Sequence, residues 1–171
     1  KINSYSPDEI IGYPSSIYQL AKYIVKHELS PLTLKVVITT GETLLPHQRM
    51  LIEKAFSCPV IDQYGCVEMA FFASQCQYGS MHLHPEHGIM EVTDISGQRV
   101  LAGESGVAVT TGLINFAMPL LRYKVGDIIS ISDKVCACKR AFPILERIEG
   151  RMDDILTTPD GRPLGRLGPL M

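Results

Sequence analysis

The stretch LKVVITTGETLLPHQRMLIEKAFSCPVIDQYG (residues 34–65) alternates apolar runs with an amphipathic run. Residues 34–42 predict a buried strand that enters a glycine turn. Residues 46–56 predict a helix with Pro46 at its first position, and residues 58–64 predict a second strand. Strand, helix and strand at this spacing predict a βαβ unit whose two strands are parallel.

Two polar motifs follow the two predicted strands, TTGE at residues 39–42 and DQYG at residues 62–65. Parallel sheets bind ligands in the crevice beyond the carboxyl ends of their strands. We therefore expect a site at this edge. Taken alone, the cluster of Asp62, Tyr64, Gly65 and Glu68 is also typical of a capped turn.

The flanking sequence extends this prediction in both directions. Residues 15–29 predict an amphipathic helix with Ser15 or Ser16 as its cap. After about residue 74 the pattern changes to short strand-like runs separated by glycine or Asp-Gly turns. We predict an α/β fold with a parallel βαβ lobe at residues 1–74, followed by a β-rich, barrel-like subdomain at residues 75–152. The short runs lie at residues 80–84, 88–94, 106–113, 127–132 and 153–158.

Composition excludes several classes of function. The chain has 171 residues and a formal net charge of -2, which gives no reason to expect a nucleic-acid or anionic-membrane partner. No apolar run is long enough to span a bilayer, and no signal peptide is recognisable. Because the chain begins with Lys1 and ends with Met171, we expect a piece of a longer cytoplasmic protein. The sequence does not indicate an oligomeric state.

The five cysteines are an odd number with uneven spacing, which indicates reduced thiols or metal ligands rather than a disulfide framework. Three of them, with one histidine, predict a tetrahedral structural zinc site. Ordinary buried thiols and a surface histidine are the open alternative. Cys58 and Cys66 are interpreted as packing residues. The predicted zinc ligands are Cys76, His82, Cys136 and Cys138, and the competing trio of His82, His84 and His87 is interpreted as surface histidines.

Four motifs together carry more information than any one alone. They are TTGE, DQYGCVE, AMPLLRYKVGD and RIEGRMDD, which begin at residues 39, 62, 117 and 147. In this order and at about this spacing they resemble the adenylate-forming (AMP-binding) superfamily. The resemblance is strongest to phenylacetate–coenzyme A ligases and to adenylating proteins of capsular polysaccharide biosynthesis. It extends from GYPSSI to DGRPLGRL, which is nearly the whole chain.

The resemblance implies a nucleotide site in the large domain of such an enzyme. Tyr64 would stack on adenine, and Asp62 or neighbouring carbonyls would accept from its amino group. Glu68 would hold Mg²⁺ against the phosphates. Asp127 would accept both ribose hydroxyls, with Arg151 near the ribose and phosphate. The implied catalytic residues are Glu68, Asp127 and Arg151, and the implied nucleotide-binding residues are Gly41, Glu42, Asp62, Gln63, Tyr64, Gly65, Cys66, Asp127 and Arg151.

The implied reaction has two steps. ATP and a small carboxylic acid give an acyl-adenylate and pyrophosphate, and a thiol such as coenzyme A then displaces AMP. The implied cofactors are ATP/AMP, Mg²⁺ and coenzyme A, with structural Zn²⁺ as a further expectation. Asp153 matches the hinge, so residues 153–171 are predicted to be the hinge and the start of a C-terminal domain.

Four departures from the family pattern limit this hypothesis. The phosphate loop and the catalytic lysine of the family lie outside the chain, so we expect the piece alone to be inactive. Val67 occupies the position where the family usually has Ser or Thr, and Gln63 disfavours phenylacetate as the substrate. Phe71 and Phe72 line an acyl pocket or belong to the core. The alternatives are a non-catalytic nucleotide-binding relative and a zinc-stabilised structural module.

Overall fold

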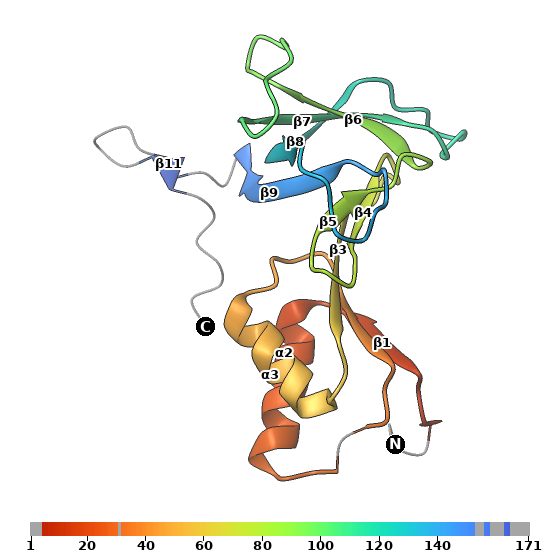
Figure 1. Cartoon of the computed structure of the whole chain (residues 1–171), viewed down its shortest axis with the longest axis vertical. Helices are drawn as coiled ribbons and strands as arrows, with labels where there is room; N and C mark the ends of the chain where they lie inside the picture. The colour runs from red at the N-terminus through yellow and green to blue at the C-terminus, as the bar shows by residue number, and fades with distance from the viewer. Residues whose placement is uncertain (1–4, 31, 153–155, 158–162, 165–171) are drawn as a thin grey trace. The chain divides into compact units, whose positions relative to one another are not determined.

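The computed structural model describes residues 5–30, 32–152, 156–157 and 163–164. It contains two compact units, Lys1–Tyr64 and Gly65–Met171, which we call the α/β unit and the β-rich unit (Figure 1). The sequence predicted the boundary after residue 74. The structure groups residues 65–74 with the β-rich unit, where strand β4 (Phe72–Gln75) pairs with strand β5 (Met81–Leu83). Of the predicted hinge region, the structure describes strands β10 (Leu156–Thr157) and β11 (Pro163–Leu164), and Asp153 lies outside the described residues.

The α/β unit consists of two consecutive βαβ units. Its three strands are all parallel and lie in the order β1, β2, β3. The predicted parallel pair and the helix that begins at Pro46 are confirmed. Strand β1 was not predicted, because four residues with two half-buried side chains are too short to show a period. The elements are β1 (Glu9–Gly12), α2 (Pro14–Lys26), β2 (Val36–Thr39), α3 (Pro46–Phe56) and β3 (Val60–Gly65).

The core of the α/β unit lies between its helices and its sheet. Figure 1 shows α2 and α3 side by side. Helix α2 buries Ile17, Ala21 and Ile24, which are three or four residues apart and so share one face. Among the described residues, no helix is long and apolar enough to cross a membrane. The buried residues of this core are Ile17, Ala21, Ile24, Leu34, Val37, Ile52, Ala55, Phe56, Cys58 and Val60.

The start of helix α2 differs from the prediction. Neither Ser15 nor Ser16 is the cap, because Pro14 occupies the first helical position and Tyr13 is the N-cap residue, without a side-chain cap. The cap comes from a distant residue. Glu42 accepts hydrogen bonds from the Ser15 backbone N–H and from Ser15 Oγ, both at 3.0 Å. A carboxylate at this place also interacts favourably with the helix dipole.

The β-rich unit is an antiparallel sheet in the order β4, β5, β9, β8, β7, β6. The prediction that this part of the chain consists of short strands is confirmed. Strands β4 and β9 were missed. β9 has five exposed residues among its eight, so it lacks an apolar alternation. The strands not yet bounded are β6 (Gly88–Thr93), β7 (Ser105–Gly112), β8 (Tyr123–Ser132) and β9 (Ile144–Arg151).

The chain before β4 packs against the ends of β6 and β7, and this contact partly closes the unit. Thr110 Oγ1 donates a hydrogen bond of 2.9 Å to the Ala70 carbonyl. Gly88 and Gly112 lie against the Ala70 backbone, and a Cβ on Gly88 would overlap the Ala70 carbonyl oxygen. These glycines permit a close approach that a side chain would prevent.

The motif AMPLLRYKVGD predicts a strand that ends in a Gly-Asp turn at residues 126–127, and this prediction is wrong. Strand β8 runs through both residues, and the register shifts between Val107 and Val109 of the partner strand. The shift marks a β-bulge in which Gly126 has φ +89°. Glycine adopts this left-handed conformation without steric cost, so the pair bends a strand instead of ending one.

Candidate functional site

The carboxyl ends of the three parallel strands meet at one edge of the α/β unit. Gly12, Thr39 and Asp62 are in register there. The fully buried Thr39 donates from Oγ1 to Asp62 Oδ1 at 2.6 Å. Burial raises the pKa of Asp62, against the opposing effects of the Thr39 hydrogen bond and the positive charge of Arg49. Asp62 is thus fixed at the edge where a parallel sheet is expected to bind ligands.

Two residues of TTGE already have structural roles in this unit. Gly41 has φ +77°, and a Cβ there would lie 2.7 Å from Tyr13 Cε1, so the tyrosine ring occupies the place of a side chain. Glu42 caps helix α2 through Ser15. These contacts account for the glycine and the glutamate without a ligand. Gln63 and Tyr64 follow Asp62 along β3, and both are half-buried.

In the β-rich unit, Glu68 and Tyr123 are in direct contact. Tyr123 Oη donates to Glu68 Oε1 at 3.2 Å. The negative charge of Glu68 and this hydrogen bond raise the pKa of Tyr123, with a smaller contribution of the same sign from Cys66. The charge of Arg151 acts in the opposite direction. Cys66, Glu68 and Arg151 therefore all lie close enough to Tyr123 to influence its ionisation.

Asp127 and Arg151 face each other across the β8–β9 ladder. Their closest charged atoms, Oδ1 and Nη1, are 4.0 Å apart. The Asp127 side chain is 14% exposed and that of Arg151 is 50% exposed. The Arg151 guanidinium lies over Gly126, where a Cβ would come within 3.0 Å of Nη2. The bulge at Gly126 thus leaves room for the arginine next to Asp127.

Ten residues are predicted for the nucleotide site, nine that bind the nucleotide and Glu68 for the metal ion, and each unit holds five of them. Gly41, Glu42, Asp62, Gln63 and Tyr64 belong to the α/β unit, and Gly65, Cys66, Glu68, Asp127 and Arg151 belong to the β-rich unit. Within the β-rich unit, Glu68 contacts Tyr123, and Asp127 faces Arg151 across the β8–β9 ladder. That all ten residues form one cleft stays a prediction.

The donor groups fit the ligands that the sequence implied. Glu68 offers hard carboxylate oxygens, and Mg²⁺ is commonly held by one or two carboxylates together with phosphate oxygens and water. Asp127 offers a carboxylate that can accept two hydroxyl groups side by side. Val67 is 98% exposed and offers no hydroxyl. Phe71 is 2% exposed, which favours a core role over an acyl pocket.

Sequence reasoning missed two residues that support these groups. Thr39 fixes Asp62, and Asn115 Nδ2 donates to the Glu68 carbonyl at 3.2 Å. A signal for Asn115 was present, because it is the one polar residue in the run LINFAMPLL at residues 113–121. No comparable signal distinguished Thr39, since threonine is common in strands.

A second cluster of functional groups lies inside the β-rich unit. Cys76 follows β4, His82 belongs to β5, and Cys136 and Cys138 lie in the connection between β8 and β9. Their ligand atoms all lie within 4.8 Å of one another. Cys76 Sγ and Cys136 Sγ are 3.7 Å apart, and Cys138 Sγ is 3.3 Å from His82 Nε2. Two thiolates on one tetrahedral zinc ion, each bound at about 2.3 Å, lie about 3.8 Å apart.

Neighbouring groups form hydrogen bonds with the donor groups of this cluster. His82 Nδ1 is 3.3 Å from the Phe142 carbonyl, and a hydrogen bond there leaves Nε2 as the ligand atom. Cys136 Sγ is 3.3 Å from Ser80 Oγ and accepts from the Cys138 backbone N–H at 3.4 Å. These hydrogen bonds lower the pKa of Cys136 to about 6, which favours the thiolate. The donor set fits Zn²⁺.

The interpretation of three histidines as surface residues is wrong for His82, which is 0% exposed because all of β5 is buried. His84 and His87 are half-buried and pack against Phe72, with ring centroids 5.1 and 5.4 Å away. His84 Nε2 also lies 2.9 Å from Ser74 Oγ. Cys58 is buried in the α/β core, as predicted.

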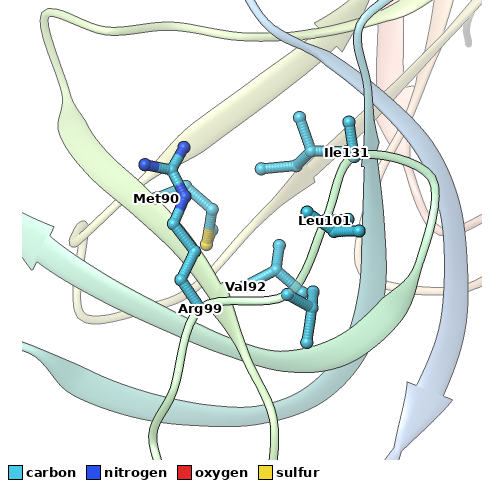
Figure 2. Close-up of a pocket in the computed structure, with 7 residues that line it drawn as sticks. Met90, Val92, Arg99, Leu101 and Ile131 are labelled. Carbon is cyan, nitrogen blue, oxygen red and sulfur yellow. The ribbon is translucent and has the colours of Figure 1, made fainter.

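A pocket of about 350 Å³ lies elsewhere in the β-rich unit. Figure 2 shows Met90 and Val92 from β6, Ile131 from β8 and Leu101 from the β6–β7 connection around it, with Arg99 as its charged group. None of the predicted site residues lines this pocket. Its apolar lining offers no acid, base or nucleophile.

Comparison with known proteins identifies the family. No protein-family model matches the chain. It is 31% identical to the Protein CapK of Staphylococcus aureus over 158 residues, which are 91% of this chain and 34% of that protein. It is 31% identical to the phenylacetate-coenzyme A ligase of Thermus thermophilus over 163 residues, which are 91% of this chain and 36% of the ligase. The chain thus spans about a third of the length of these relatives.

Solved structures agree with this result. The chain matches 2-hydroxyisobutyryl-CoA ligase, in the postadenylation state in complex with R3-HIB-AMP, with a TM-score of 0.84 and 28% identity. The match covers 96% of this chain and 36% of the ligase. The anthranilate CoA ligase AuaEII in complex with anthranoyl-AMP matches with a TM-score of 0.68 and 19% identity, over 96% and 33% of the two chains, and supports the fold alone. The chain therefore belongs to the adenylate-forming superfamily, in which CapK and the phenylacetate–coenzyme A ligases are among its relatives.

Proposed function

We propose that the complete natural protein containing this chain activates a carboxylic acid with ATP and transfers the acyl group to a thiol such as coenzyme A. The observation that supports the proposal is that the β-rich unit carries the Tyr123–Glu68 hydrogen bond and the Asp127–Arg151 pair, whose residues belong to the motifs of the resemblance. The relatives named as phenylacetate-coenzyme A ligases and the matched ligase in complex with an adenylate support it.

The chemistry assigns a task to each group of the β-rich unit. Asp127 accepts from the ribose hydroxyls, and Arg151 lies beside it to contact the ribose and phosphate. Glu68 would hold Mg²⁺, and the bound ion would supply positive charge against the negative charge that grows on the phosphates. The acid's own carboxylate attacks the α-phosphorus and pyrophosphate leaves. Because the acid reacts as a carboxylate, this first step needs no general base from the chain. In the second step the thiol loses its proton to water, the sulfur attacks the acyl carbon, and AMP leaves.

Strand β3 and the residue that follows it supply the adenine contacts in this proposal. Tyr64 stacks on the base, while Asp62, Gln63, Gly65 and Cys66 line its surroundings. We assign Gly41 a structural role, because the ring of Tyr13 fills the place of a side chain there. We assign Glu42 a supporting role, because its carboxylate is occupied by Ser15 and holds the TTGE loop on helix α2. The proposed partners are small molecules, and the cytoplasmic location stays a prediction.

Pyrophosphate release by the complete protein over a panel of aryl and aliphatic acids tests this function. We expect release with at least one acid. Asp127→Ala and Glu68→Gln should each lower the rate by at least about tenfold, a typical loss for a group that contacts the transition state. Asp94→Asn is the matched control, because Asp94 is an exposed carboxylate that bonds to its own turn. Equal rates in all variants contradict the proposed roles.

A non-catalytic nucleotide-binding relative is the second candidate. Val67 favours it, because this exposed side chain offers no hydroxyl to a phosphate at a position where the family usually has one. In that case the complete protein binds AMP but releases no pyrophosphate with any acid. Turnover that appears in Val67→Thr supports this candidate, and turnover in the wild-type protein excludes it.

We also propose that Cys76, His82, Cys136 and Cys138 hold a structural Zn²⁺. The spacing of the two sulfurs, the four ligand atoms within 4.8 Å and the burial of the site support a closed, four-coordinate centre. Such a centre has no open position for a substrate. It would join the β4–β5 turn to the β8–β9 connection, and so stabilise the unit that carries Glu68 and Asp127.

Metal analysis of the purified complete protein tests the zinc centre. We expect one zinc ion per chain and, after Co²⁺ substitution, the visible absorption of a tetrahedral thiolate complex. Cys138→Ser should lower the zinc content. Cys58→Ser should not, because Cys58 is a buried thiol of the α/β core outside the cluster. A folded wild-type protein without zinc, in which all thiols react with a thiol reagent, contradicts the proposal.

A further inference from the structure

Glu68 is held at two points by the segment Leu113–Tyr123. Tyr123 Oη donates to its carboxylate at 3.2 Å, and Asn115 Nδ2 donates to its backbone carbonyl at 3.2 Å. One contact fixes the side chain and the other fixes the main chain. The two contacts together define the orientation of Glu68.

Asn115 makes one hydrogen bond to Glu68 and another within its own loop. Its Oδ1 accepts from the Met118 backbone N–H at 3.2 Å, so the same amide closes its own loop and holds Glu68. Glu68 itself lies in a tight turn, in which the Met69 N–H bonds to the Cys66 carbonyl at 3.0 Å. Met69 has φ +57°, a left-handed conformation that a non-glycine residue adopts at a cost. The hydrogen bond from Asn115 to the Glu68 carbonyl therefore stabilises a turn that contains a strained residue.

The phenol is a suitable group for this task. It is protonated at neutral pH, because a phenol has a pKa of about 10, so it can donate to the carboxylate without carrying a charge. A cationic partner such as lysine would neutralise Glu68 and compete with a metal ion. Each carboxylate oxygen has two lone pairs, so a carboxylate that accepts one hydrogen bond can still bind a cation.

We infer that Tyr123 is a positioning residue, which holds the Glu68 carboxylate in the orientation that binds the divalent cation on the nucleotide phosphates, while Asn115 fixes the backbone beneath it. This inference rests on the proposed nucleotide site. A purely structural role for Tyr123 makes a different prediction, because loss of the phenol would then change stability and leave the cation requirement as it was.

The test compares Tyr123→Phe with the wild-type complete protein and with Tyr23→Phe as a control. Tyr23 is an exposed tyrosine of helix α2 that packs against His27. Calorimetric titration with ATP in the presence of Mn²⁺ or Mg²⁺ measures the cation-dependent affinity, and titration with AMP alone measures nucleotide binding without the cation. We expect Tyr123→Phe to weaken the cation-dependent affinity about threefold to tenfold, the loss of one hydrogen bond, with AMP affinity unchanged.

A second readout needs no metal and no activity. The Tyr123 hydroxyl donates to Glu68, so its NMR signal at neutral pH in the protein without added cation should shift in Glu68→Gln relative to the wild type. Asn115→Asp keeps the acceptor for Met118 but loses the donor to Glu68, so it should also weaken the cation-dependent affinity. The Tyr23→Phe control should match the wild type in every measurement.

The outcomes separate this inference from the proposed function. An unchanged cation dependence in Tyr123→Phe, or a phenol that ignores Glu68→Gln, overturns the positioning role even if pyrophosphate is released. Weakened Mn²⁺–ATP binding in a protein that activates no acid supports the positioning role and contradicts the proposed reaction. A wild-type protein that does not bind Mn²⁺–ATP at all overturns both.

Discussion

The two units of the chain are stabilised in different ways. The α/β unit buries large aliphatic and aromatic side chains between two helices and a parallel sheet, and Phe56 and Ile52 are at most 1% exposed. The β-rich unit also buries large apolar side chains such as Phe71 and Ile129, but among the described residues it buries more polar groups than the α/β unit. Those buried polar residues are His82, Thr93, Thr110, Ser130 and Ser132, against Thr39 in the α/β unit.

This difference separates two sources of stability. Buried apolar area contributes to stability wherever side chains of about the right volume pack together. The core of the α/β unit should therefore tolerate apolar substitutions that conserve volume. Buried polar groups contribute only when each has its specific partner, so the β-rich unit depends on individual contacts. The sites that we propose in the β-rich unit are made of such contacts.

Removal of the metal should have the largest effect and should be confined to one unit. Metal binding to such ligands couples to folding, so a strong chelator at neutral pH should destabilise the β-rich unit by several kcal/mol. Hydrogen exchange in the complete protein should then increase in β5, β8 and β9 while α2 and α3 stay protected. An equal increase in both units would show that they unfold together, and no increase would contradict a structural metal.

The reverse experiment uses the α/β core. Phe56→Ala removes a side chain that is 1% exposed and should cost about 3–5 kcal/mol of the free energy of unfolding. Hydrogen exchange should increase in α2 and α3, and the zinc content should stay at the wild-type value. A loss of zinc in this variant would contradict the independence of the two units.

The helix cap offers a smaller effect. Glu42→Ala removes the acceptor for the Ser15 N–H and hydroxyl and should cost about 1 kcal/mol in urea unfolding. Glu9→Ala is the control, because Glu9 is an exposed residue of the same unit. If Glu42→Ala instead left stability unchanged and weakened AMP binding, Glu42 would be a direct nucleotide contact.

The smallest expected effect is the pH dependence of the contribution that Asp62 makes to the free energy of unfolding. Burial raises the pKa of Asp62 from its ordinary value of 3.8, so the folded state disfavours the charged form. This penalty is present above the raised pKa and disappears below the ordinary value. Asp62→Asn should therefore increase the free energy of unfolding at pH 7 and change it little under acidic conditions. Equal effects at both pH values would assign the change to the Thr39 hydrogen bond instead.

The contrast between the units also explains what the sequence could predict. The periods of α2, α3 and β2 follow from burial of one face, so apolar spacing predicted them. The cap of α2 could not be predicted, because its acceptor lies 27 residues away. Strand β9 was missed since its side chains are mostly exposed, and the bulge at Gly126 was mistaken for a turn because both use a left-handed glycine.

The candidate sites show the same limit. The spacing of Cys76, His82, Cys136 and Cys138 suggested a metal centre, but the burial of His82 and its bond to Phe142 depend on tertiary packing. Motif order identified Glu68 and Asp127. It gave no indication that Tyr123 and Asn115 hold Glu68, since those hydrogen bonds join residues 55 and 47 positions apart.

Gly41 carries a consequence for how such motifs are used. The ring of Tyr13 already excludes any side chain at this position, and the positive φ excludes most residues again. A descendant that had lost every ligand would need the same glycine to keep its helix and loop together. At this position a motif match therefore detects a shared architecture, and evidence for chemistry has to come from side chains that the fold itself does not require.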